Sequence, residues 1–118
     1  MQLLSLNCVI LPVDENPSQN VFLVEVLKSK SVNVLKDLIK KERSHRLNHV
    51  DAADLLLSQV SLLVDNDLKE SLKNVDLTPL MPLLPVSQVF PRVEENRLHI
   101  IVQAPTNGEA ISVFLHVY

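Results

Sequence analysis

Glycine is almost absent from this sequence, in which Gly108 is the only glycine among 118 residues. Loops that wrap around nucleotide phosphates need several glycines, because only glycine lets the backbone come close enough to the phosphate. The common nucleotide-binding motifs are therefore excluded. Tryptophan is missing, and three phenylalanines and one tyrosine are the only aromatic residues. The chain thus lacks a stacking surface for unpaired bases, and its net charge of −3 does not favour a nucleic-acid partner.

Cysteine is limited to Cys8, which excludes a disulfide within the chain. Long apolar runs are missing too, so we expect no membrane-spanning segment and no membrane partner. The N-terminal residues MQLLSLNCVIL have neither a basic region nor a cleavage site with small residues. They predict a strand and not a signal peptide. The length and the 47% hydrophobic content fit one globular domain.

Residues 31–41 have the clearest helical periodicity in the chain. Val32, Leu35, Leu38 and Ile39 fall on one stripe, and polar residues cover the other faces. Ser31 stands at the position of an N-cap, where its hydroxyl would accept a hydrogen bond from a backbone amide. A lone amphipathic helix among strands must bury its stripe against a sheet.

Alternating apolar residues predict strands before and after this helix. The predicted strands are residues 3–11, 21–27, 55–63, 97–103 and 110–117. The first two are separated by a polar loop and predict a hairpin. For residues 55–63 both faces carry apolar side chains, so the pattern does not indicate which face is buried. We expect a common core of Leu6, Cys8, Phe22, Val24, Leu35, Ile39, Leu57, Ile100 and Val102.

Residues 67–74, which lie between the predicted strands at 55–63 and 97–103, predict a short helix. Residues 78–91 contain four prolines, three of them spaced every third residue. This spacing suits a polyproline-like ligand for a partner domain. The favoured alternative is an ordered crossover that carries Leu80, Leu83 and Leu84 over the core, because no basic residue flanks the run of three evenly spaced prolines closely enough to orient a partner.

Candidate catalytic and metal-binding groups are few, and each has a structural alternative. His45 and His49 have the spacing of two metal ligands on a helix, but no third ligand is evident. Cys8, His99 and Asp54 could form a nucleophile triad, although Cys8 is expected in the core, where its thiol would be inert. Asp65, Asp67 and Glu70 lack the spacing and the glycine of a calcium loop. We therefore expect no catalytic residue, cofactor or metal site.

The order strand, strand, helix, strand, irregular stretch, strand is typical of the β-grasp fold. The helix and the strands after it resemble those of ubiquitin. This resemblance implies an α+β domain with a mixed sheet of four to five strands packed on one main helix, and with the last of these strands in the centre. The chain ends in LHVY and not in a Gly-Gly tail, so conjugation to other proteins is not expected.

A finer pattern resembles the N-terminal domain of the Crinkler effectors, in particular the fungal members. The matching residues are Leu6–Leu11, Ser31-Val32, Leu35-Lys36, Ile39-Lys40, Asp51-Ala52, Asp54-Leu55, Leu68–Asn74, Val89–Pro91, Glu94-Glu95 and Leu98–Val102. The resemblance implies a non-catalytic, ubiquitin-like N-terminal domain, which precedes a variable domain in secreted proteins that enter a host cell and often its nucleus. An intracellular signalling adaptor that is not secreted is the alternative.

Oomycete Crinklers carry an LFLAK translocation motif on the third strand. The aligned residues here are Leu57, Ser58, Gln59, Val60 and Ser61, of which only the leucine agrees. The translocation motif is therefore degenerate in this chain. The ubiquitin-like Crinkler N-terminal domain is expected to span residues 1–105, with residues 106–118 as an extension.

The extension is too apolar to leave in water and predicts an additional strand. Its apolar residues are Ile111, Val113, Phe114, Leu115 and Val117. A central last strand has no free backbone groups to pair with it. We therefore expect residues 110–117 to pair with a sheet edge of this chain or of a second copy in a homodimer.

Overall fold

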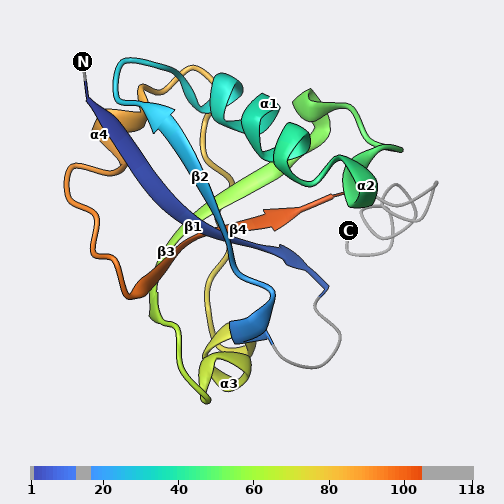
Figure 1. Ribbon diagram of the computed structural model, residues 1–118, viewed down its shortest axis with the longest axis vertical. Coiled ribbons are helices and arrows are strands. Elements are labelled where there is room, and N and C mark those ends of the chain that lie inside the picture. Colours follow the sequence, from blue (N-terminus) through green and yellow to red (C-terminus); the bar gives the residue numbers. More distant parts are fainter. Residues whose placement is uncertain (1, 13–16, 105–118) are drawn as a thin grey trace.

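The computed structural model of the protein describes residues 2–12 and 17–104 (Figure 1). Within these ranges the elements are β1 (Leu3–Leu11), η1 (Pro17–Gln19), β2 (Phe22–Leu27), α1 (Val32–Glu42), α2 (Ser44–Leu47), η2 (Ala52–Asp54), β3 (Leu56–Leu63), α3 (Leu68–Lys73), α4 (Val86–Val89) and β4 (Arg97–Gln103). None of the described helices is long and apolar enough to cross a membrane. The expected strand at 110–117 lies outside the described residues.

The four strands form one mixed sheet in the order β2-β1-β4-β3. β1 and β2 make the predicted antiparallel hairpin, with Leu6 opposite Val24. β4 pairs in parallel with β1 and in antiparallel with β3. The expected α+β architecture, with the last of these strands in the centre, is therefore confirmed.

The main helix begins as the sequence predicts and ends one residue after the expected range, at Glu42. The Ser31 hydroxyl accepts a hydrogen bond from the Val34 amide at 3.5 Å. The preceding amides, those of Val32 and Asn33, donate to backbone carbonyls of residues 84 and 82. At the other end Arg43 lies over the Phe22 ring at 4.4 Å, which ties the end of α1 to β2.

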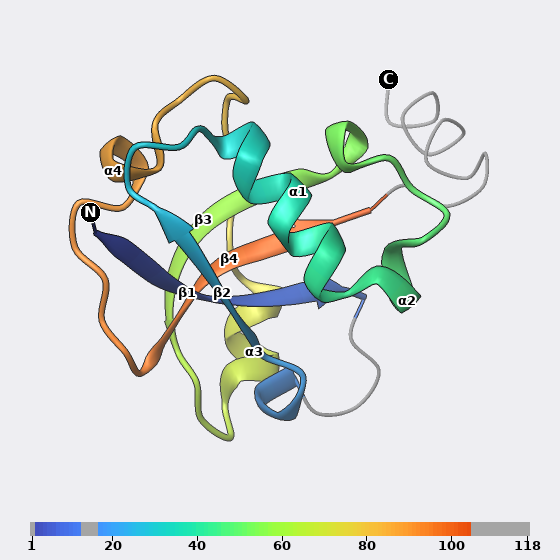
Figure 2. The same ribbon diagram turned by 45° about the horizontal axis from the view of Figure 1, so that its top comes forward.

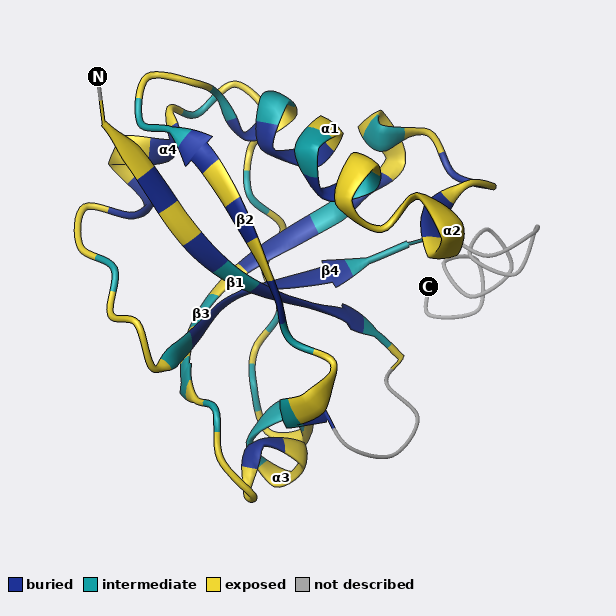
Figure 3. Ribbon diagram, in the orientation of Figure 1, coloured by how far each residue is buried: buried dark blue, intermediate teal, exposed yellow. Residues whose placement is uncertain are grey.

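The core between α1 and the sheet contains all nine residues expected there. β1 and β2 each alternate buried and exposed residues along the hairpin (Figure 3). Their buried side chains meet Leu35 and Ile39 of α1, which are fully buried. Val86, Val89 and Phe90, from α4 and the residue after it, complete this core.

A second apolar cluster covers the opposite face of the sheet. Val9, Leu98 and Ile101 are buried there against Leu68 of α3. Leu72 and several apolar residues of β3 and the segment after α3 pack around them. Figure 2 shows α1 and α3 on opposite sides of the sheet. The two-sided apolar pattern of β3 is thereby explained, because both faces of the sheet are covered.

The proline-containing crossover also covers the outer edge of β3. Pro79 forms a bridge with Ser58, and the Leu80 amide donates to the Leu57 carbonyl at 2.7 Å. Unpaired backbone groups on a sheet edge invite pairing with other chains, so this contact protects part of the β3 edge.

The crossover differs from the expected one at a single leucine. Leu80 and Leu84 pack against the core as predicted. Leu83 instead points into solvent and is 83% exposed. The prediction was wrong there because the Pro82 and Leu84 carbonyls are turned toward the first amides of α1. With the residues on both sides of Leu83 held in this way, its side chain faces outward.

We expect Leu35→Ala and Ile39→Ala each to lower the free energy of unfolding by about 2–5 kcal/mol, because each leaves a cavity under α1. Urea unfolding measures this change. Leu83→Ala is the matched control and should leave the stability nearly unchanged. If either core variant unfolds at the same urea concentration as the control, α1 does not pack as described.

Candidate functional site

The two histidines with metal-ligand spacing do not share a helix. His45 lies in α2, which ends at Leu47, and His49 lies beyond it. Both side chains are exposed. Among the described residues no group of three histidine, cysteine, aspartate or glutamate side chains is arranged to hold a metal ion.

Cys8 is fully buried in the core under α1. Its thiol contacts the Leu6 carbonyl at 3.6 Å, and burial raises the pKa of the Cys8 thiol far above its usual range. A buried neutral thiol is a poor nucleophile. Asp54, the third member of the hypothetical triad, is exposed. The structure therefore does not assemble a triad from these residues.

The acidic cluster before α3 forms local contacts. The Asp65 carboxylate accepts a hydrogen bond from the Asp67 amide at 2.9 Å. Glu70 pairs with Lys73 across one helical turn at 3.2 Å. The first contact lies in the turn between β3 and α3, and the second lies within α3.

The residues aligned with the translocation motif are built into β3. Leu57 lies in the core under α1, and Ser58 is fully buried. The Gln59 side chain donates to the Val89 carbonyl at 2.7 Å, which ties β3 to α4. Only Gln59 and Ser61 of the five are exposed. Leu57 and Ser58 are therefore inaccessible to a partner while β3 is folded.

A polar junction forms where β1 separates from β4. The ladder between these strands begins at Cys8, opposite Ile100. One residue earlier, the Asn7 amide donates to Nδ1 of His99 at 2.9 Å. The Asn7 side chain donates to the carbonyls of Glu95 and Arg97, at 3.0 and 2.7 Å. Side-chain hydrogen bonds thus take the place of the backbone ladder at this point.

These contacts determine the protonation state of His99. Because Nδ1 accepts from the Asn7 amide, the ring proton lies on Nε2, which donates to the Glu94 carbonyl at 2.7 Å. Burial lowers the pKa of His99, and this effect outweighs the hydrogen bond to Glu94 and its nearby carboxylate, which raise it. Both ring nitrogens are occupied by backbone groups, so His99 acts as a structural residue.

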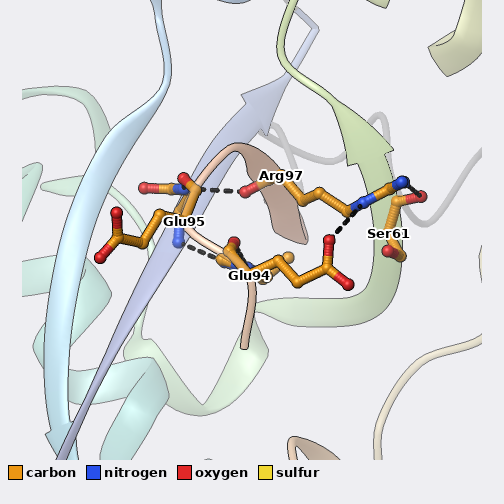
Figure 4. Close-up of polar contacts among 6 residues, drawn as sticks. Ser61, Glu94, Glu95 and Arg97 are labelled. Carbon is orange, nitrogen blue, oxygen red and sulfur yellow. Dashed lines mark hydrogen bonds and ion pairs between the residues drawn. The ribbon is translucent and has the colours of Figure 1, made fainter. Parts of the chain in front are cut away.

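Glu94 and Arg97 form an ion pair at 3.1 Å next to this junction. Arg97 also donates to the Ser61 carbonyl at 3.2 Å, which joins the loop before β4 to β3. Figure 4 shows the Glu95 side chain pointing away from the Glu94–Arg97 pair. Glu95 is exposed and has no ion-pair partner among the described residues.

A depression of about 630 Å³ opens beside the junction. Asn7 and Val21 line it from the hairpin, Leu63, Val64 and Asp65 from the end of β3, and Glu95 and Asn96 from the loop before β4. An apolar groove of about 510 Å³ lies at the other end of β1, lined by Leu11, Pro12, Leu72 and Ala104 among others. Both are open to solvent.

Sequence reasoning missed the junction and the depression. Asn7 and His99 lie 92 residues apart, and no local pattern brings them together. The one signal is a polar residue between apolar neighbours in each strand, Asn7 in β1 and His99 in β4. Such residues need hydrogen-bond partners when buried.

Comparison with known proteins identifies the family. A family model described as the Crinkler effector protein N-terminal domain matches residues 4–103. The chain belongs to the Crinkler effector N-terminal domain family. It is 33% identical over 94 residues to Crinkler effector protein 1 of Rhizophagus irregularis. That match covers 76% of this chain and 20% of the relative, so the chain spans about one fifth of the relative's length.

The Crinkler domain has a ubiquitin-like fold. The solution structure of the C-terminal ubiquitin-like domain of mouse tubulin-specific chaperone e is similar, with a TM-score of 0.54. The two share 23% sequence identity, and the likeness covers 90% of each chain. The matched Crinkler region contains the whole described sheet apart from Leu3, together with the junction and the depression.

We expect acid to destabilise the Crinkler domain through His99. The folded-state pKa lies below the ordinary value of 6.5, so the unfolded chain binds the proton first as the pH falls. The contribution of His99 to the free energy of unfolding is complete above about pH 6.5. It is lost as the pH falls from there through the lower folded-state pKa.

Urea unfolding at neutral and mildly acidic pH, on the parent and on His99→Gln, measures this effect. The parent should lose more stability than the variant between the two conditions, since the variant has no imidazole to protonate. The same loss in both proteins would contradict the role of His99.

Proposed function

We propose that this chain is the non-catalytic, ubiquitin-like N-terminal domain of a secreted Crinkler-type effector, which serves delivery into a host cell, protein–protein interaction, or both. The observation that supports this proposal is the family match over residues 4–103. About four fifths of the matched relative lies outside the shared region. Chemical activity of a complete protein is thus expected in such a further region.

The chemistry of the described residues supports a non-catalytic function. The Cys8 thiol is neutral and buried. Both His99 nitrogens are bonded to the backbone. General acid–base and nucleophilic catalysis need such groups within reach of a substrate.

The proposed destination is the host cell, including its nucleus, after secretion. Family membership supports this destination. Because Leu57 and Ser58 are buried, a delivery receptor that read the whole segment 57–61 would have to unfold β3. Recognition of a folded surface elsewhere on the domain avoids that cost.

Expression of the complete natural protein with a C-terminal epitope tag, in its own cells grown on a host, tests the proposal. We expect the protein in host tissue or culture medium, and proximity labelling should give protein partners there. A protein found only inside the producing cells would contradict secretion and favour the intracellular adaptor. A cytosolic marker protein controls for lysis.

We also propose that residues 110–117 pair as a strand with the free edge of β2, in this chain or in a second copy. β4 is paired on both sides, and the crossover covers part of the β3 edge. The Lys28 amide donates to the Gln2 carbonyl, so by alternation the amides of Leu23 and Glu25 face away from β1. Of the described edges, the β2 edge is thus the better template for an added strand.

Deletion of residues 106–118 should lower the mass measured by light scattering if the strand pairs between copies, or the stability if it pairs within one chain. Leu23→Pro should have the same effect, because it removes an outward amide and leaves the bonds to β1 intact. Leu23→Ala, which keeps the outward amide, is the control. If neither deletion nor Leu23→Pro changes mass or stability, the strand proposal is wrong.

A further inference from the structure

The depression beside Asn7 is held open by the polar junction. The Asn7 side chain fixes the loop before β4 through the Glu95 and Arg97 carbonyls. Arg97, the first residue of β4, pairs with Glu94 of this loop and donates to the Ser61 carbonyl, so it joins the loop to β3. The walls of the depression therefore come from segments that are fixed relative to one another. A preformed surface of this kind loses little entropy on binding.

Apolar side chains form part of its surface. Val21, Leu63 and Val64 line the depression, and Leu63 is 51% exposed. Leu23 lies directly opposite Asn7 in the hairpin, on the same face of the sheet, and is 50% exposed. Two half-exposed leucines beside one concave surface favour contact with apolar groups of a partner.

The charge around this surface has one sign. Asp65 and Glu95 line the depression, and none of the residues that line it is lysine or arginine. Neither carboxylate is ion-paired among the described residues, whereas the neighbouring Glu94 is neutralised by Arg97. Glu25, two residues after Leu23 on the same face, is also exposed.

We propose that this depression binds a short segment of a partner protein that carries lysine or arginine next to apolar side chains. The volume of about 630 Å³ is sufficient for a few side chains. The basic groups would meet Asp65 and Glu95, and the apolar groups would meet Leu63, Val64 and Leu23. This inference depends on the proposed interaction function and names the chemistry of the partner.

Two labelled hexapeptides test it, one alternating arginine with leucine and one alternating glutamate with leucine. Each is titrated into the ¹⁵N-labelled protein of 118 residues. We expect the arginine peptide to shift the amides of Asn7, Val64 and Asn96, and to bind more weakly as salt is added. The glutamate peptide should cause no such shifts.

Two variants test the surface. Asp65→Asn combined with Glu95→Gln, and separately Leu63→Ser, should each weaken binding of the arginine peptide by about tenfold or more, while the melting temperature stays near that of the parent. Glu70→Gln and Leu83→Ser change one charge and one exposed leucine elsewhere. They should bind as the parent does.

The proposal is overturned if the arginine peptide does not bind at millimolar concentration, if both peptides bind equally, or if the shifts lie outside the depression. Shifts of the amides lining the depression that depend on protein concentration without peptide, and that persist after deletion of residues 106–118, would assign the surface to a second copy and also overturn it. Cell-derived partners that remain bound to the Asp65→Asn, Glu95→Gln variant would reject this site and leave the interaction function intact. If the parent protein itself binds no cell-derived partner, the interaction function is rejected.

Discussion

The parallel pairing of β1 with β4 is the constraint on which the rest of this domain depends. It joins Cys8–Leu11 to Ile100–Gln103, so the first and last described strands lie side by side in the centre of the sheet. β2 and β3 can then pair only on the outside. Two central strands have two faces to cover, and α1 and α3 cover one each. Where the pairing stops, at Asn7, the strands separate and the depression opens.

Local sequence patterns were sufficient to predict α1 and the face of the sheet that it covers. The strict alternation of Leu4, Leu6 and Cys8 in β1 indicated one buried face, and the stripe containing Leu35 and Ile39 indicated the helix that covers it. The order of the elements, together with the resemblance to ubiquitin, placed the last of the four strands in the centre. These features depend on periodicity within one element, which a single sequence records directly.

The opposite face of the sheet, which α3 covers, depends on contacts between residues that are far apart in the sequence. β3 has apolar side chains on both faces, so its own pattern could not indicate that Leu68 and Leu72 of α3 cover the second face. The Asn7–His99 contact likewise joins two strands that are far apart in sequence. The surfaces that we assign to binding lie away from α1, since the face of the sheet under α1 is buried. Family membership supports the proposed function, and the carboxylates of Glu95 and Asp65 are the basis for the proposed chemistry of the partner.

Native-state hydrogen exchange of the backbone amides measures the dependence on the β1–β4 pairing most directly. The Ile101 amide, in the central strand, and the Asn7 amide, bonded to the His99 ring, should exchange only when the whole domain unfolds. The Leu83 amide, in the exposed part of the crossover, should exchange far faster. If the Asn7 amide exchanges as fast as that of Leu83 while Ile101 stays protected, the junction does not extend the central pairing. If Ile101 itself exchanges by local opening, the central pairing is not the constraint that holds the domain together.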